Sequence, residues 1–317
     1  MNAKNILVVL ALSVAGTPAW AESKTWNAKA DGNASDAENW SPVGVPVAGD
    51  TIVLDGTSVR AMTWDAGVNE LPATVAEWQQ NSAYTGTVTF ATTYDSVENS
   101  SFKVFTVSGD VTLEGGKWTH PANEDKEVWR LRVDVGGKLT ITNAAIDCSL
   151  KGYAATNFPA GSQPGSHGGA LDHAWVYGDL KEPVNLGAGG WWPAAEGGKA
   201  GGGAIYLTVS GAVEVAKGGR ILANGAGKTG GQWSVDKGGA GGSIYIQAES
   251  LTLDGNIRAN GSYNGQGKGG AGGRVALDLV KQNFDNVNFG NLSARGLGAR
   301  ENPGCGTVFV KTEDKPN

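Results

Sequence analysis

Cysteine and histidine are scarce in this 317-residue chain, with two and three copies respectively. Two cysteines are too few for the disulfide framework that holds together many small secreted domains. A bond between Cys148 and Cys305 would require Cα atoms within about 7 Å of each other. The two cysteines fall at different corners of the sequence repeat, so we expect no bond between them.

Charge is also sparse, at 18% of residues, and the net charge is −6. No run of lysine or arginine appears, whereas nucleic-acid binding requires clustered cations that neutralise phosphates. We therefore expect neither a nucleic acid nor an anionic membrane as a partner. Beyond the N-terminal segment no apolar run approaches the ~20 residues that span a bilayer, so we expect no membrane span.

The N-terminal segment has the three parts of a secretory signal peptide. Lys4 supplies a positive start, residues 6–14 are apolar, and Ala19-Trp20-Ala21 forms a small-x-small cleavage site. We expect residues 1–21 to be a signal peptide and the mature chain, beginning near Glu22, to be secreted.

Glycine is abundant, with 50 copies, and apolar residues make up 40% of the chain. No Gly-X-Y period appears, which excludes collagen. The apolar content is too high for a disordered chain. Because the glycines cluster between short apolar runs, they indicate turns.

From about residue 105 to residue 310 the chain repeats a three-part pattern of short alternating strands separated by glycine-rich segments. The clearest copy has strands at 205–209, 213–215 and 221–225. Repeats of this length, none able to bury its own apolar face, indicate stacked units. Other copies pair apolar residues in the same three slots: Phe105/Val107, Val111/Leu113 and Trp118/His120; Leu131/Val133, Leu139/Ile141 and Ile146/Cys148; Ile244/Ile246, Leu251/Leu253 and Ile257/Ala259; Val275/Leu277, Val287/Phe289 and Leu292/Ala294; and Val308/Val310.

The pattern predicts an all-β fold, a right-handed single-stranded parallel β-helix with three sheets and glycine-rich loops. Period-2 alternation sends one row of side chains inward, and parallel crossovers are almost always right-handed. Asn224 and Asn260 end equivalent strands, so we expect them to form a stacked ladder at one corner.

Two regions depart from the repeat. Residues 22–100 are rich in tryptophan (Trp26, Trp40, Trp64, Trp78) and are interpreted as an N-terminal cap and first coils; the alternative is that these rings stack on sugars. We expect residues 101–317 to form the parallel β-helix, which is interrupted by a long insertion at 149–203. Long excursions from a regular fold are often functional.

Several segments carry a resemblance to a known family: Trp26, Asp31-Gly32, Asn39-Trp40, Pro46, Gly49-Asp50-Thr51, 84–88, 107–113, 152–153, 166–169 and 177–179. On these segments the chain resembles the glycine-rich, passenger-type parallel β-helix domains of exported bacterial surface proteins, which are autotransporter- or adhesin-like. The resemblance implies location outside the cell or in the envelope of a bacterium, and adhesive or structural roles.

The insertion holds the residues that we single out as a site. An aromatic floor with polar edges suits polysaccharides, because the C–H face of a sugar packs on a ring. Ligand-binding candidates are His167, Trp175, Tyr177, Trp191 and Trp192. Weak catalytic candidates are Asp172, His173 and Asp179, which could act as an acid–base pair.

We expect no cofactor and no metal site. The loop with Asp31, Asn33, Asp36 and Glu38 leaves calcium open as an alternative, although it lacks a hand-type pattern. The sequence favours a non-enzymatic scaffold or adhesive module contacting carbohydrate or matrix polymers. Two alternatives stay open: a polysaccharide lyase or glycoside hydrolase with its site beside 149–203, and an envelope-layer or filament building block that associates end to end.

Overall fold

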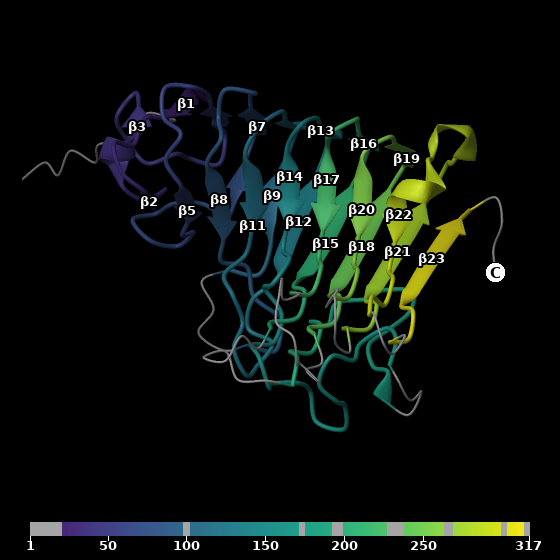
Figure 1. Ribbon diagram of the computed structural model, residues 1–317. Helices are drawn as coiled ribbons and strands as arrows, with labels where there is room; N and C mark the ends of the chain where they lie inside the picture. The colour runs from purple at the N-terminus through teal and green to yellow at the C-terminus, as the bar shows by residue number, and fades with distance from the viewer. Residues whose placement is uncertain are drawn as a thin grey trace, which may run out of the picture.

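The computed structural model describes residues 21–97, 102–170, 175–191, 199–226, 238–262, 269–298 and 303–313. Within these ranges the chain is almost all β, with no α-helix and a few short 3-10 turns. The strands form three sheets, A, B and C (Figure 1). Among the strand pairs of the described ranges, only β1 with β3 is antiparallel. The prediction of an all-β fold with three parallel-rich sheets is confirmed.

Each sheet takes strands from along the whole chain. Sheet A contains β1 (Ser23–Trp26), β3 (Trp40–Ser41), β4 (Thr51–Leu54), β7 (Glu77–Gln80), β10 (Val111–Leu113), β13 (Leu139–Ile141), β16 (Ala212–Val215) and β19 (Ser250–Leu253). Sheet B contains β2 (Gly32–Asn33), β5 (Met62–Trp64), β8 (Thr87–Phe90), β11 (Lys117–Thr119), β14 (Ala145–Asp147), β17 (Arg220–Leu222), β20 (Asn256–Arg258) and β22 (Leu292–Ser293). Sheet C contains β6 (Thr74–Val75), β9 (Phe105–Val107), β12 (Leu131–Val135), β15 (Ala204–Val209), β18 (Ser243–Ala248), β21 (Arg274–Leu279) and β23 (Thr307–Thr312).

From β4 to β21 the chain visits the sheets in the fixed order A, B, C, and we call one such passage a circuit. From β4 to β18 each strand pairs with the strand three places further on, while β20 and β21 pair with β22 and β23. The alternating sequence explains the register: Ile205, Ile244, Val275 and Val308 lie opposite one another in successive strands of sheet C. The first, second and third strands of the sequence repeat fall in sheets C, A and B respectively.

The last copy of the repeat departs from the prediction at Phe289. This side chain is 51% exposed, and two 3-10 turns, η4 (Phe284–Asn286) and η5 (Phe289–Asn291), replace a sheet A strand. The Asn283 and Asn288 side chains accept hydrogen bonds from the N–H groups of Asp285 and Gly290. Such local bonds offer the backbone an alternative to a sheet ladder. Val287 keeps its predicted place, bridged to Leu253.

Aromatic side chains fill the interior of the first circuits. Trp26, Trp40, Trp64 and Trp78 have almost no exposed surface. Neighbouring rings in this column meet edge to face, as Trp78 and Trp118 do with centroids 5.2 Å apart. The alternative interpretation of these four tryptophans as sugar-stacking platforms is therefore wrong, because a ligand could not reach their faces. In later circuits valine, leucine and isoleucine take over the core.

The corner after sheet B carries the asparagine ladder that the sequence predicts. The Asn224 Oδ1 atom accepts from the Asn260 N–H at 2.9 Å, and the Asn260 Oδ1 atom accepts from the Arg295 N–H at 2.8 Å. Each side chain therefore ties its own circuit to the backbone of the next. Cys148 is buried one residue before this corner, Cys305 is exposed, and both thiols are free.

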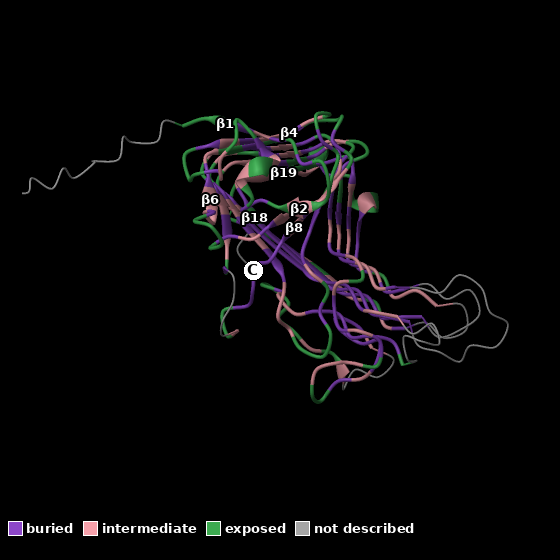
Figure 2. Ribbon diagram, turned by 90° about the vertical axis from the view of Figure 1, so that its left-hand side faces the viewer, coloured by how far each residue is buried: buried purple, intermediate pink, exposed green. Residues whose placement is uncertain are grey.

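The connections from sheet B to sheet C gather into a second body, which we call the glycine lobe. Its described residues are 149–170, 175–191, 199–203, 223–226, 238–242, 259–262, 269–273, 294–298 and 303–306. Figure 2 shows the lobe extending away from the three sheets. The predicted insertion at 149–203 is thus one part of a larger structure that every later circuit joins.

Hydrogen bonding in the lobe repeats every three residues. Gly239 and Gly242, three residues apart, donate to Ala226 and Ala223 of one antiparallel segment, while the two residues between them donate to two other segments. Three residues per turn and outward-pointing amides are features of a polyproline II helix, which makes no internal hydrogen bonds. Segment 269–273 repeats the arrangement, with Gly270 and Gly273 donating to Ser262 and Ala259.

Close packing explains why these segments are glycine-rich. A Cβ atom on Gly241 would overlap the carbonyl oxygen of Ala259, and one on Gly202 would overlap that of Ala223. Only glycine allows such an approach of two backbones. Within the described part of the chain, no helix is long and apolar enough to cross a membrane.

Candidate functional site

The insertion places His167 and Tyr177 together, with His167 inside the lobe and Tyr177 half-buried. Their ring centroids are 4.8 Å apart, and His167 has no exposed surface. Its Nδ1 atom lies 2.8 Å from the Gly241 carbonyl oxygen. Burial lowers the pKa of His167 to about 3, so the ring is neutral near pH 7. A ligand contact at His167 would require the lobe to open.

Tyr177 is bound into the same packing. Its hydroxyl donates to the Leu186 carbonyl oxygen at 2.6 Å, and its own carbonyl accepts from Arg274 Nε at 2.9 Å. Burial raises the pKa of the Tyr177 hydroxyl. Both bonds hold the segment after Tyr177 against the lobe, which is a structural role.

The other described candidates differ in exposure. Trp191 is 57% exposed, Trp175 is half-buried, and Asp179 is exposed. The Asp179 Oδ1 atom accepts from the N–H groups of Lys181 and Glu182, and these bonds lower the pKa of the carboxyl group. Asp172, His173 and Trp192 lie outside the described residues.

The segment 179–186, which we call the strap, covers part of the outer face of sheet C. Tyr206 donates to Glu182 Oε1 at 2.6 Å, and Ser243 Oγ donates to the Asn185 carbonyl oxygen at 2.6 Å. Val184 packs against the stacked rings of Tyr206 and Tyr245. This aromatic pair therefore holds the strap and presents little surface to a ligand.

A half-buried carboxylate that contacts the strap, that of Glu127, was not singled out from the sequence. Glu127 accepts from Asn185 Nδ2 at 3.1 and 3.2 Å and from the Leu186 N–H at 3.2 Å. Burial raises the pKa of Glu127, and its hydrogen bonds oppose that shift. No periodic signal marks Glu127, because its partners come from a segment about 58 residues away.

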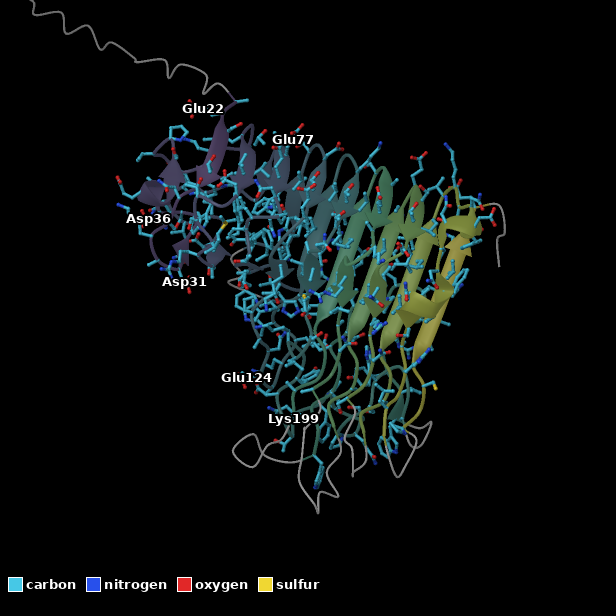
Figure 3. The ribbon with its side chains drawn as sticks, turned by 45° about the horizontal axis from the view of Figure 1, so that its top comes forward. Glu22, Asp31, Asp36, Glu77, Glu124 and Lys199 are labelled. Atoms are coloured by element: carbon cyan, nitrogen blue, oxygen red, sulfur yellow. The ribbon has the colours of Figure 1, made fainter. Side chains whose placement is uncertain are left out.

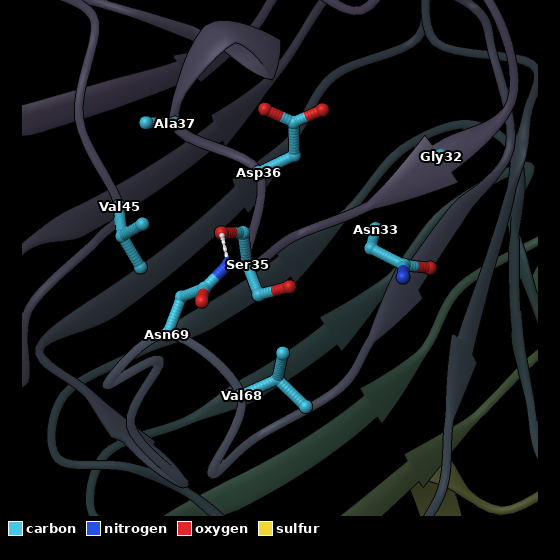
Figure 4. Close-up of a pocket in the computed structure, with 8 residues that line it drawn as sticks. All are labelled: Gly32, Asn33, Ser35, Asp36, Ala37, Val45, Val68 and Asn69. Carbon is cyan, nitrogen blue, oxygen red and sulfur yellow. Dashed lines mark hydrogen bonds between the residues drawn. The ribbon is translucent and has the colours of Figure 1, made fainter.

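The N-terminal acidic loop lies at one end of the molecule (Figure 3). Asp31 Oδ1 accepts from the Ala61 N–H, and Asp36 Oδ1 accepts from the Glu38 N–H, capping η1 (Ala37–Asn39). Beside it lies a pocket of about 760 Å³, lined by Asn33 and Asp36 among others (Figure 4). Among described residues, no group of three or more His, Cys, Asp or Glu side chains is placed to hold a metal.

The outer face of sheet B carries a groove of about 490 Å³ that crosses four successive circuits. Turns from sheet A to sheet B form part of its lining, and two lining residues in these turns are left-handed: Gly116 and Asn143 have φ values of 60° and 54°. Glycine and asparagine tolerate this conformation. Polar and charged residues line the groove: Ser82, Glu114, Lys117, Asn143, Asp147 and Arg220.

The groove residues come from segments far apart in the sequence and meet because the circuits stack. Lys117 lies opposite Ala145, which lies opposite Arg220, so the two cations occupy one column of sheet B. Asp147 stands two residues along, in the neighbouring column. Only the strand register brings these charges to one face.

Comparisons with protein-family models, with curated proteins and with solved structures returned no match. The groove therefore has to be interpreted from its own chemistry. It combines both signs of charge with an amide, and it runs along the stack rather than into the core. Such a surface suits an extended polar ligand that makes many weak contacts.

Proposed function

We propose that this chain is an exported, non-enzymatic scaffold or adhesive module of the passenger type, a right-handed parallel β-helix that contacts carbohydrate or matrix polymers. The groove on sheet B is the observation that carries the proposal, because it crosses four circuits and offers hydrogen-bonding and charged groups along its length. A linear polysaccharide presents hydroxyl groups at regular intervals, as the circuits present side chains.

The distribution of titratable groups favours binding over catalysis. An acid or base with a shifted pKa in a cleft is a typical catalytic candidate. Shifted groups such as His120, His167 and Glu127 are engaged with protein partners: His120 Nε2 accepts from the Ala204 N–H, for example. Tyr84 lines the groove and burial raises its pKa, but its hydroxyl donates to the Arg60 carbonyl oxygen. The groove carboxylates Glu114 and Asp147 come from different circuits, and Asp147 already accepts from the Ser149 N–H.

A polysaccharide panel tests the proposal. We expect the mature chain from Glu22 to be retained on at least one immobilised polysaccharide and to release no product. Lys117→Ala with Asn143→Ala should reduce retention several-fold, whereas Lys281→Ala, on an exposed turn away from sheet B, should not. New reducing ends or unsaturated sugars would instead identify a lyase or hydrolase.

One observation favours end-to-end association as a second function. Within the described residues, β23 pairs only with β21, and Val308, which belongs to the inward row, is 44% exposed. An open strand edge is a template for pairing with another chain. Sedimentation across a concentration series tests this, with Val308→Lys expected to shift the chain towards monomer.

A further inference from the structure

Three arginines form a diagonal line that begins on the outer face of sheet B and ends at the corner just after β22, where the glycine lobe starts. The register sets Leu222 opposite Arg258, and Arg258 opposite Ser293. Arg258 therefore lies one circuit after Arg220 and two residues further along the strand direction. Arg295 has the same relation to Arg258. We call Arg220, Arg258 and Arg295 the arginine line.

The spacing within the arginine line is regular. Neighbouring strands are about 4.8 Å apart, and two residues along a strand cover about 6.7 Å. The step from one arginine to the next is therefore roughly 8 Å. Strand pairing fixes the backbone at Arg220 and Arg258. Arg295 is held by two hydrogen bonds, since its N–H donates to Asn260 Oδ1 and its carbonyl oxygen accepts from the Gly261 N–H.

The line is open and its charge is not neutralised by the protein. Arg220 and Arg295 are exposed and Arg258 is half-buried. Among the described residues none of the three takes part in an ion pair. In Figure 1 the strands β17, β20 and β22 lie side by side. Lys117, in the same column as Arg220, extends the positive charge towards the groove.

Hydrogen-bonding side chains flank the arginines. Asn256 lies opposite Arg220 in the next circuit, and its Oδ1 atom has no hydrogen-bond partner. Asn224 and Asn260, whose oxygens are used in the ladder, stand beside Arg258 and Arg295. Amides next to guanidinium groups suit a ligand that carries hydroxyl groups as well as negative charge.

We propose that the arginine line binds a linear carboxylated polysaccharide lying across sheet B. A guanidinium group matches the geometry of a carboxylate and pairs with it through two parallel hydrogen bonds. A regular row of such groups fits a stiff chain that carries carboxylates at intervals. This inference rests on the proposed polymer-binding function and specifies the charge of its ligand.

The same surface is poorly matched to nucleic acid. Single-stranded nucleic acid is held largely by stacking of bases on aromatic side chains. The strands β11, β14, β17, β20 and β22 place no aromatic residue outward. A duplex would need many phosphate contacts, whereas the protein is acidic overall, at net charge −6.

Affinity electrophoresis of the mature chain tests the proposal, with polygalacturonate, neutral dextran, a 30-nucleotide oligothymidine and phosphatidylserine vesicles as probes. We expect binding to polygalacturonate that weakens with added sodium chloride. Changing all three arginines to glutamine should weaken it about tenfold, as expected for three partly exposed ion pairs. The matched control Arg60→Gln removes an exposed arginine before β5 and should leave binding unchanged.

The outcomes separate this inference from the function on which it rests. If the triple variant binds polygalacturonate as well as the unaltered chain, or if oligothymidine or vesicles bind more tightly, the arginine line is not a carboxylated-polysaccharide site. If dextran alone is bound, polymer binding stands and the charge assignment fails. Equal melting temperatures for variant and parent exclude misfolding, because all three side chains point away from the core.

Discussion

At the scale of single residues, Gln80 is an amide in the middle of an aromatic interior. Its Oε1 atom accepts from the indole N–H groups of Trp118 at 3.1 Å and Trp78 at 3.4 Å. Its Nε2 atom donates to the Gly115 carbonyl oxygen. One side chain thus accepts hydrogen bonds from two indole N–H groups, whose burial without a partner would cost free energy.

We predict that Gln80→Leu destabilises the fold by about 1–3 kcal/mol, because it leaves buried donors without partners. Urea unfolding followed by tryptophan fluorescence measures the change. The matched control is Gln79→Leu, since Gln79 is adjacent and exposed. Equal stabilities of the two variants would show that the indoles find other acceptors.

The buried histidines give a second prediction at this scale. His120 and His167 each have a pKa of about 3 in the folded protein, because burial disfavours the charged ring, against 6.5 for a free histidine. Between these values the unfolded chain binds a proton that the folded chain does not. Stability should therefore fall as pH decreases from about 6.5, by about 1.4 kcal/mol per pH unit for each histidine.

The variant His167→Asn isolates one of these contributions. Asparagine can still donate to the Gly241 carbonyl oxygen but does not titrate. Unfolding free energies measured between pH 6.5 and 4 should show a slope smaller by about 1.4 kcal/mol per pH unit than in the parent. Glu127 acts in the opposite direction, because its raised pKa favours the folded state in acid. It contributes equally to both proteins, so a pH-independent difference would contradict the assignment.

At the scale of elements, the glycine lobe depends on segments that each bond to several neighbours. Gly241 donates to Ala271, while the residues on either side of it donate to Ala188 and Ala223. A segment that is hydrogen-bonded to three neighbouring segments leaves no room for side chains. Alanines such as Ala240, whose methyl groups fit between the neighbours, are the exception.

We predict that Gly241→Ala destabilises the protein by about 1–3 kcal/mol, as overpacked interiors do, and speeds amide exchange in 238–242. Gly49→Ala is the matched control, because a Cβ there would lie 3.8 Å from the nearest atom, the Ala21 Cβ. Hydrogen exchange and urea unfolding measure both effects. A lobe that exchanges at the same rate in both variants would argue against the close packing.

The strands could be predicted from the sequence because alternation is a local signal. Ile205, Ile244 and Val275 identify their slots without knowledge of the neighbouring circuits. The lobe could not, since glycine runs carry no periodicity that separates a turn from a packed segment. Phe289 was misplaced because Asn283 and Asn288 cap local turns, which compete with the repeat at the end of the chain.

The candidate site was less predictable than the fold, for the same physical reason. Trp191 and Tyr177 are close in sequence, yet the strap and the lobe give them different surroundings. The arginine line draws on positions about 37 residues apart, and only the pairing of β17, β20 and β22 reveals it. Residues that act together through register are invisible to a search for local motifs.

At the scale of the whole molecule, the three sheets and the lobe have different kinds of core. The sheets enclose a column of aromatic and aliphatic side chains, whereas the lobe is held mainly by backbone hydrogen bonds. The same circuits form both parts. The sheet that carries the groove and most of the arginine line is therefore connected to the lobe in each circuit from β14 onward. A binding surface on such a sheet needs little ordering when a polymer arrives.

Each lobe segment forms hydrogen bonds with segments of its own circuit and of the adjacent circuits. The molecule can therefore be lengthened or shortened only by whole circuits. Removing one strand would leave glycine backbones without partners, while duplicating a complete circuit would supply strand and lobe segment together. Evolution or an engineer could therefore lengthen the outer face of sheet B in steps of one circuit, and each step would carry its own share of the supporting lobe.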